Sequence, residues 1–295
     1  MAGGLDHLVV VARDLDAQAE LYRRLGFQVG GRNRHDWGTL NHIVQFDGCF
    51  LELLTTEQGF QRPESSAPVA QFVDTIVDYL AVREGLAMMV LEGHDAAADH
   101  ASFNTAGIGM PETFYFARQG RKPDGTPVEV AFSLAFARTS DVRDAGFFVC
   151  QQHAPEMFWN KSFQEHPNGA SGIVRIVFAS DSPERHAAFF AAYTGRSAAQ
   201  IEGGLRFKLA RGAVDVLVPS RCAEIFGARA LPEGLDTPRF AAIEFAVEDQ
   251  ARVVAKLIEG DIPFEKQADA VVVPARDAMG VTLAFNEFDT AKNGA

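Results

Sequence analysis

Apolar and polar positions in the first 56 residues follow a pattern that predicts one helix and several strands. Residues 5–11 read LDHLVVV, an apolar run typical of a strand. Asp14 is a good N-cap for a helix that follows at once, and Gly26 lies just past its end. Three further strands are predicted at residues 27–30, 41–46 and 50–54, with Asp47-Gly48 as the turn between the last two.

The same order of one strand, one helix and three strands recurs three more times. The later units begin with strands near Leu86, Gly172 and Arg239, and their helices start near Asp95, Ser182 and Glu248. A repeat of roughly 70 to 85 residues is too long for a solenoid. Other predicted segments are linkers at residues 56–68 and 221–238, a helix at 69–82, a crossing segment at 155–172, a turn at Pro123-Asp124-Gly125 and a frayed tail from 289.

Each unit exposes one sheet face that must be covered by another unit. Pairing the first with the second and the third with the fourth covers all four faces. The sequence therefore predicts an α+β fold of four βαβββ modules, paired into two cupped mixed sheets. We expect two domains, at residues 1–160 and 161–295.

Two stretches of the first unit resemble the vicinal oxygen chelate superfamily, and within it the glyoxalase-like proteins of the glyoxalase, bleomycin-resistance and dioxygenase group. They read LDHLVVVARDLDAQAELYRRLGFQV and GTLNHIVQFDGCFLELL. A third stretch, CQQHAPEMFW with HPNGA, is similar to a glyoxalase-like subgroup with long chains. The resemblance is clear over residues 5–54 and 146–172. It implies that each pair of modules forms a cup around a divalent metal ion.

The resemblance also implies metal ligands on the first and last strand of each module in a pair. His7 and Glu52 match both places in the first module. Met88 stands where the second module would place its first ligand, and a thioether is a poor ligand for zinc, iron, nickel or manganese. His153 is the predicted third ligand, with Gln151 next. The alternative is a hydrogen-bonded core His7, a Glu52 paired with an arginine, and a His153 that merely begins a loop.

Other polar and aromatic residues of the first half are candidates for the rest of the site. His42, on a predicted strand, is a candidate acid–base group together with Glu52, and a structural histidine is the alternative. Candidate substrate contacts are Trp37, Asn41, Gln151 and Trp159, with His35 at the pocket mouth. In the second half the matching places are apolar, at about Val174 and Ala242, and residues 213–220 and 281–287 show no inward acid flanked by a histidine.

Composition narrows the class of protein. The formal charge of −12 argues against a nucleic-acid or anionic-membrane partner, which would need a basic face. Three cysteines are an odd, sparse set that fits a reducing cytoplasm. No signal peptide, membrane span or nucleotide-binding glycine motif is evident. We expect a small-molecule substrate and a monomer or homodimer.

Three functions fit these residues. The first is a metal-dependent glyoxalase-like enzyme, a lyase or isomerase that chelates vicinal oxygens of a small substrate to zinc, iron, nickel or manganese. The second is an extradiol-type dioxygenase, because two histidines and a carboxylate are the ligands of non-haem iron. The third is a metal-free protein that binds and sequesters a small ligand, which the methionine at position 88 favours.

Overall fold

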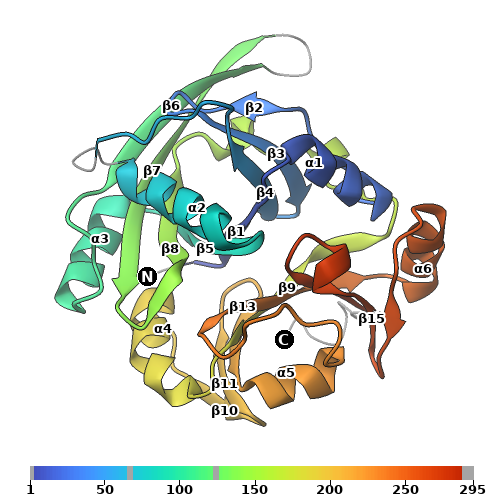
Figure 1. Ribbon diagram of the computed structural model, residues 1–295. Helices are drawn as coiled ribbons and strands as arrows, with labels where there is room; N and C mark the ends of the chain where they lie inside the picture. The colour runs from blue at the N-terminus through green and yellow to red at the C-terminus, as the bar shows by residue number, and fades with distance from the viewer. Residues whose placement is uncertain (1–2, 65–68, 122–125, 288–295) are drawn as a thin grey trace.

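The chain forms two eight-stranded mixed sheets that pack together through their outer faces. The structure, a computed structural model, describes residues 3–64, 69–121 and 126–287. The strand orders are β2-β3-β4-β1-β5-β8-β7-β6 and β10-β11-β12-β9-β13-β16-β15-β14. The blue-to-green half and the yellow-to-red half of the chain each build one of these sheets (Figure 1). The predicted arrangement of four modules in two sheets is therefore confirmed.

The first sheet contains two modules related by an approximate repeat. Each places its opening strand in parallel with its own last strand, and the two opening strands pair antiparallel at the centre. The first module comprises β1 (Leu5–Val11), α1 (Leu15–Arg24), β2 (Asn33–Arg34), β3 (Thr39–Phe46) and β4 (Cys49–Thr56). The second comprises β5 (Gly85–Gly93), α3 (Ala96–Thr105), β6 (Phe114–Arg121), β7 (Pro127–Thr139) and β8 (Val142–Gln152).

The second sheet repeats this topology. Its third module comprises β9 (Ala170–Ala179), a 3₁₀ turn at Pro183–His186, α4 (Ala187–Thr194), β10 (Ala199–Ile201), β11 (Gly204–Lys208) and β12 (Ala213–Leu217). Its fourth comprises β13 (Arg239–Val247), α6 (Gln250–Glu259), β14 (Glu265–Lys266), β15 (Ala270–Val273) and β16 (Thr282–Glu287). Short 3₁₀ turns also occur at Pro155–Met157, Lys161–Phe163 and Ala275–Asp277. In the sequence, residues 153–169 connect the last strand of the first sheet to the first strand of the second sheet. The domain boundary at 160 stays a prediction.

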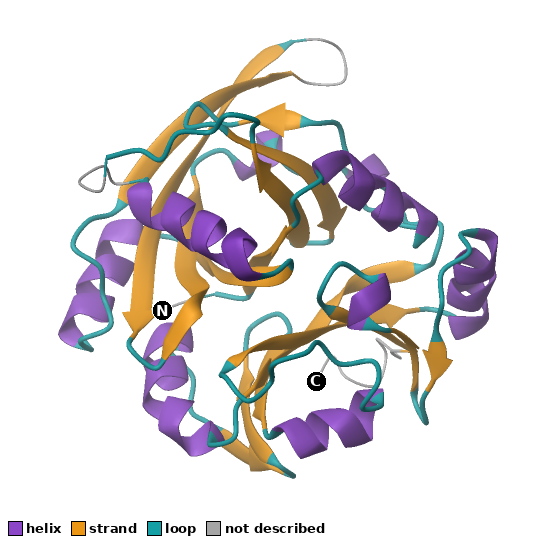
Figure 2. Ribbon diagram, in the orientation of Figure 1, coloured by secondary structure: helices purple, strands orange, loops and turns teal. Residues whose placement is uncertain are grey.

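Two helices outside the modules each lie across the inner face of one sheet. The helix α2 (Ala70–Val82) crosses the first sheet, and α5 (Pro219–Phe226) crosses the second (Figure 2). The helix predicted at 69–82 is thus present. The linker predicted at 221–238 is wrong in its first part, because α5 reaches Phe226. There Pro219 at the helix start and the buried Cys222 and Phe226 allow a short helix where prolines and glycines suggested a loop.

Aspartate side chains cap three of the six α-helices that the structure describes, and two predicted boundaries differ from the structure. Asp14 caps α1 by accepting from the Ala17 N–H at 2.9 Å, as expected. Ser182 makes no side-chain cap, and a 3₁₀ turn precedes α4. Residues 27–30 are not a strand, because regular pairing with β3 begins at Asn33, although the Gly30 N–H donates to the Ile43 carbonyl at 2.8 Å. The predicted turn at Pro123-Asp124-Gly125 and the tail from residue 289 lie outside the described residues.

Strand alternation divides the buried side chains into a layer between the sheets and two inner cups. Leu8 and Val10 of β1 belong to the large cluster that joins both sheets, whereas Val9 and Val11 face the cup of the first sheet. The inner face of the second sheet has a smaller, mostly alanine and valine cluster under α5. None of the helices that the structure describes is long and apolar enough to span a membrane.

The connection between the sheets is held by a histidine that must stay neutral. His166 accepts a hydrogen bond from the Gln28 N–H at 3.0 Å through Nδ1, and its Nε2 donates to the Gln45 carbonyl at 2.8 Å. Only the neutral ring can accept and donate in this way. Burial lowers the pKa of His166 to about 4, so the ring is neutral at physiological pH.

Tyr193 of α4 anchors the second half of the chain to the first sheet, and its removal should weaken the fold. Its hydroxyl lies 2.7 Å from the Met89 carbonyl oxygen and 2.9 Å from that of Phe148, where it donates. Tyr193→Phe leaves these buried carbonyls without that donor. We expect a loss of about 1–3 kcal/mol in the free energy of unfolding, measured by urea denaturation. Tyr115→Phe, at an exposed tyrosine, is the control, and equal stability of the two variants would contradict the anchoring role.

Candidate active site

The cup of the first sheet contains a narrow cavity with an apolar wall and a polar end. Aromatic side chains from five different elements form most of the wall, and Leu134, Ile43 and Cys150 complete it. The helix α2 closes one side through Phe72. The polar side chains in the lining are His7, His35, Asn41, Glu52 and Arg118. This composition, an apolar chamber with a few convergent polar groups, is typical of a small-molecule site.

Glu52 and His7 face each other at the polar end. The Glu52 Oε2 and the His7 Nε2 are 4.0 Å apart, and both side chains are more than nine-tenths buried. They lie on adjacent parallel strands, where Glu52 pairs with Val9 and His7 is two residues earlier on the same face. A buried carboxylate is costly unless it is paired, hydrogen-bonded or used for binding. The two side chains therefore lie close together in the cup of the sheet, as predicted.

His7 is fixed by a carboxylate behind it. The Asp6 Oδ2 lies 2.6 Å from His7 Nδ1, and the other Asp6 oxygen accepts from Gln152 Nε2 at 2.8 Å. An ionised carboxylate only accepts, so Nδ1 carries the proton and Nε2 is left facing the cavity. Asp6 and His7 are neighbours in sequence, and they meet because the pairing of β1 with β5 shifts register between Leu5 and His7.

Glu52 is linked to Arg118 through two asparagines. The Asn41 amide donates to Glu52 Oε1, and the Asn33 amide donates to Asn41 Oδ1 at 3.1 Å. Arg118 Nη1 donates to Asn33 Oδ1 at 3.2 Å. Burial lowers the pKa of Arg118, and the charge of Glu52 opposes that shift. This chain fixes one Glu52 oxygen and leaves the other directed at His7.

His35 is a third polar group on the cavity wall. Its Nδ1 is 2.8 Å from the Thr39 hydroxyl, and its ring stacks on Trp37 with centroids 4.5 Å apart. Burial lowers the pKa of His35, the negative charge of Glu52 acts against that, and the positive charge of Arg118 adds to it. The ring is therefore neutral near pH 7 and offers a hydrogen-bonding nitrogen without a charge.

Four of the predicted site residues lie elsewhere. His42 points to the opposite face of β3 from Asn41 and bonds to the Gly30 carbonyl, because adjacent strand residues alternate in direction. Gln151 accepts from the Ala96 N–H at the start of α3. His153 is exposed and bonded to the Ser133 hydroxyl. Trp159 packs behind the cavity wall, 5.0 Å from the Phe158 ring. None of the four lines the cavity.

The donor set differs from the metal set that the resemblance implies. By strand pairing, Met88 and Phe148 are the second module's counterparts of His7 and Glu52. Neither is a suitable ligand for a hard or borderline divalent ion. The described residues contain no group of three or more His, Cys, Asp or Glu side chains placed to hold a metal ion. The cavity thus supplies two of the four expected donors, and these residues do not fit a four-ligand centre.

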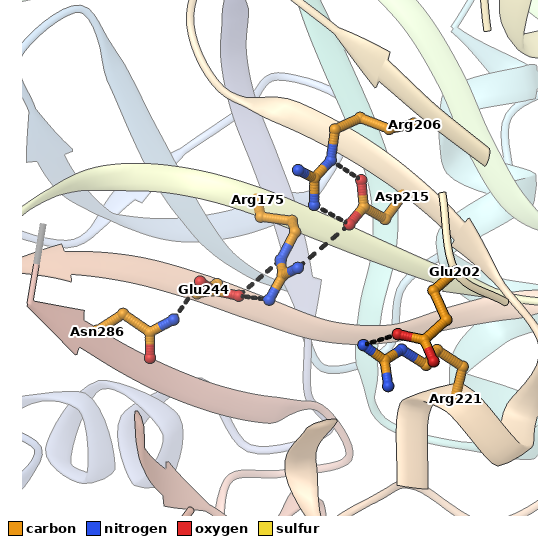
Figure 3. Close-up of polar contacts among 7 residues, drawn as sticks. All are labelled: Arg175, Glu202, Arg206, Asp215, Arg221, Glu244 and Asn286. Atoms are coloured by element: carbon orange, nitrogen blue, oxygen red, sulfur yellow. Dashed lines mark hydrogen bonds and ion pairs between the residues drawn. The ribbon is translucent and has the colours of Figure 1, made fainter. Parts of the chain in front are cut away.

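The second sheet carries an ion-pair network where the first has the cavity. Val177 pairs with Asp215 as Val9 pairs with Glu52, so Arg175 rather than Val174 is the counterpart of His7. Asp215 does point inward, but its partners are arginines. Arg206 bonds both of its oxygens at 2.7 Å, and Arg175 spans Asp215 and Glu244 (Figure 3). Ala242 is apolar, as predicted. This cup is therefore closed by charge pairing.

Sequence patterns hint at two of the residues that the prediction missed. Phe114, Phe116 and Arg118 alternate along one face of β6, and an arginine on an aromatic strand face is a recognisable pocket signal. Gln152 follows the predicted Gln151, but its direction depends on strand register. Asp6 beside His7 carries no such signal, because regular alternation would turn it away.

Comparison with known proteins identifies the family. A model of the glyoxalase-like domain matches residues 5–194. The chain belongs to this family. The match covers all of the first sheet and extends to the end of α4, so it includes the cavity. A search of curated proteins finds no match.

Solved structures share the fold at low sequence identity. A hypothetical protein from Staphylococcus aureus has a TM-score of 0.68 and 12% identity, covering 96% of this chain and 99% of that one. An Mn(II)-bound glyoxalase from Novosphingobium aromaticivorans has a TM-score of 0.57 and 12% identity, with coverages of 97% and 82%. A triple mutant of 4-hydroxymandelate synthase from Streptomyces coelicolor has a TM-score of 0.55 and 11% identity, with coverages of 98% and 93%. Together with the family match, they place this chain in the vicinal oxygen chelate superfamily.

The environment of His35 predicts a pH response. Because burial lowers the pKa of His35, we expect its ring-proton NMR resonance to titrate with a midpoint below 6.5. The unfolded chain takes up this proton first as pH falls below 6.5, so the folded state loses stability in that range. His35→Gln assigns the resonance and should reduce the dependence of stability on pH. A midpoint at or above 6.5 would contradict the buried, neutral ring.

Proposed function

We propose that the cavity of the first sheet is the active site of a glyoxalase-like enzyme that moves a proton on a small oxygen-bearing substrate. The observation that carries the proposal is the pair of Glu52 Oε2 and His7 Nε2, 4.0 Å apart at the end of an aromatic cavity. Asp6 fixes His7 through its Nδ1 atom, and Asn41 fixes Glu52 through its Oε1 atom. Such fixed, desolvated acid and base groups are what proton transfer requires.

In this proposal Glu52 acts as the base, and His7 and Asp6 stabilise the charge that develops. Glu52, a carboxylate with one oxygen free of Asn41, removes a proton from a carbon next to a carbonyl. His7 in its protonated form donates a hydrogen bond from Nε2 to the oxygen on which charge develops, and Asp6 holds the ring through Nδ1. The proton on Glu52 then returns to the same carbon or to its neighbour. The aromatic wall excludes water while the charge is present.

The cavity offers fewer ligands than the resemblance implies for a metal ion. His7 and Glu52 are the side chains that would hold a divalent ion, which would supply Lewis-acid stabilisation. Met88 and Phe148 leave the other two positions without donors, so no step of the proposal depends on an ion. The dioxygenase alternative needs a third side-chain ligand, and His153 is bonded to Ser133 outside the cavity.

Binding without chemistry is the second candidate function. The observation that favours it is the replacement of two donor positions by Met88 and Phe148, which makes that side of the cup apolar. For both functions the partner is a small molecule, and we propose a monomer or homodimer without nucleic acid. The three free, buried cysteines support a cytoplasmic location.

Solvent deuterium exchange tests the proton-transfer proposal on a panel of simple carbonyl compounds. Small 2-hydroxy and 2-oxo carbonyl compounds are incubated with the protein in D₂O, and loss of carbon-bound protons is followed by NMR. We expect exchange that falls at least about 100-fold in Glu52→Gln, because the base is lost. Glu129→Gln, at an exposed glutamate of the same sheet, is the control. Absence of catalysed exchange in the wild type would favour the binding function.

Removal of divalent ions separates the two forms of the enzyme proposal. Because the described residues supply donors at only two of the four expected ligand positions, we expect exchange activity to survive dialysis against a strong chelator. Elemental analysis of protein purified without a histidine tag accompanies the assay. A stoichiometric metal that is lost in both His7→Ala and Glu52→Ala, together with loss of exchange on chelation, would establish metal dependence instead.

A further inference from the structure

The cavity lining includes a partly buried arginine that makes no ion pair with the described residues. Arg118 projects from β6 on the same strand face as Phe114 and Phe116. Among the described residues, its hydrogen bond is to the neutral Asn33, and no carboxylate oxygen lies within 4.0 Å of its guanidinium. A guanidinium carries five N–H donors, and an uncompensated cation is costly to bury. No other described residue accepts from its remaining donors, which can therefore bind a ligand.

Arg118 also lies between the chamber and a second groove. The inner cavity and this larger groove share Ile43, Arg118 and Phe158 in their linings. The groove continues past Gly30 and Gly31 to the outside. A ligand that reaches His7 and Glu52 by this route passes the guanidinium. The hydrogen bonds through Asn33 and Asn41 connect Arg118 to Glu52 and hold the guanidinium apart from the carboxylate.

We propose that Arg118 binds the carboxylate of the substrate, and that the substrate is a small carboxylic acid with an apolar, ring-sized body. This inference rests on the proposed function and specifies its substrate class. The planar guanidinium matches the two oxygens of a carboxylate. The aromatic rings of Trp37, Phe116 and Phe132 suit an apolar body.

The local charges favour a singly charged anion over a phosphate. One cation faces the ligand, and the described residues that line the cavity include no lysine. Glu52 and Asp6 lie at the same end and would repel a second negative charge. Arg118 and Glu52 line the same cavity, so an acid whose carboxylate is bound at Arg118 has its carbon chain in the chamber that contains the base. The acid would therefore present its reacting carbon to the base.

A matched pair of ligands tests this assignment by isothermal titration calorimetry. The probes are 3-phenylpropanoate and its neutral isostere 3-phenylpropanamide. We expect the wild type to bind the carboxylate at least tenfold more tightly than the amide. Arg118→Gln should weaken carboxylate binding at least tenfold and change amide binding less than twofold. Arg229→Gln, at an exposed arginine beyond α5, removes the same charge and should change neither.

Several results would overturn the assignment. They are equal affinity of the wild type for the two probes, no saturable binding of either, or stronger competition by inorganic phosphate than by the carboxylate. Arg118→Lys keeps the positive charge but loses the planar pair of N–H donors, so it should bind 3-phenylpropanoate with intermediate affinity. It serves as a second variant if circular dichroism shows that Arg118→Gln does not fold.

The binding test and the proton-transfer test can fail separately. Glu52→Gln removes the base but keeps Arg118 and should still bind 3-phenylpropanoate. If Arg118-dependent binding is found without deuterium exchange, the carboxylate site stands and the enzymatic proposal falls. If exchange is found that Arg118→Gln leaves unchanged for carboxylate substrates, the enzymatic proposal stands and this one falls.

Discussion

The burial of one carboxylate organises the first sheet. Glu52 lies at the end of an aromatic cavity, where a negative charge is tolerated only if its oxygens are hydrogen-bonded or used. Asn41 binds one oxygen, and the other faces His7. Asn41 is held in turn by Asn33, and Asn33 receives Arg118. Four polar residues of the cavity lining, His7, Asn41, Glu52 and Arg118, are therefore connected around this carboxylate, and His35 bonds separately to Thr39.

The second sheet shows what the same architecture becomes when its buried charges are neutralised internally. Asp215 takes the place of Glu52, and Arg175 and Arg206 satisfy it (Figure 3). The guanidinium groups occupy the cup that the first sheet leaves to a ligand. In the first sheet Arg118 lines the cavity but makes no ion pair with Glu52, and it donates a hydrogen bond to the Asn33 side-chain amide. Function is therefore expected in one cup, while the other stabilises the fold.

Two features of the first cup separate this chain from a metal centre with four side-chain ligands. Strand pairing places Met88 and Phe148 where the second pair of donors would stand. At the same time, Asp6 fixes the ring of His7 and Arg118 brings a positive charge to the chamber. A positive side chain near the reacting groups can hold an anionic substrate and stabilise developing negative charge. The cavity thus has its own means of binding an oxygen-bearing molecule.

The sequence alone determined the modules and their pairing, because these depend on local patterns, and the family resemblance pointed to His7 and Glu52. The alternation of apolar and polar residues in a strand, the Asp14 cap and the glycine after the first helix can each be recognised within a few residues. His7 and Glu52 lie on two predicted strands that pair in the first sheet. The helix α5 was missed because Pro219 and the prolines and glycines that follow the helix indicate a loop, while its burial against the second sheet decides otherwise.

Only the tertiary structure decided the rest of the site. Whether His42 or Asn41 faces the cavity depends on the phase of alternation, which a shift of one residue reverses. The register shift in β1 turns Asp6 toward His7, and the pairing of distant strands brings Arg118 to Asn33 across 85 positions of sequence. These contacts depend on register and closure of the sheet, which the residues specify only through the packing of the whole chain.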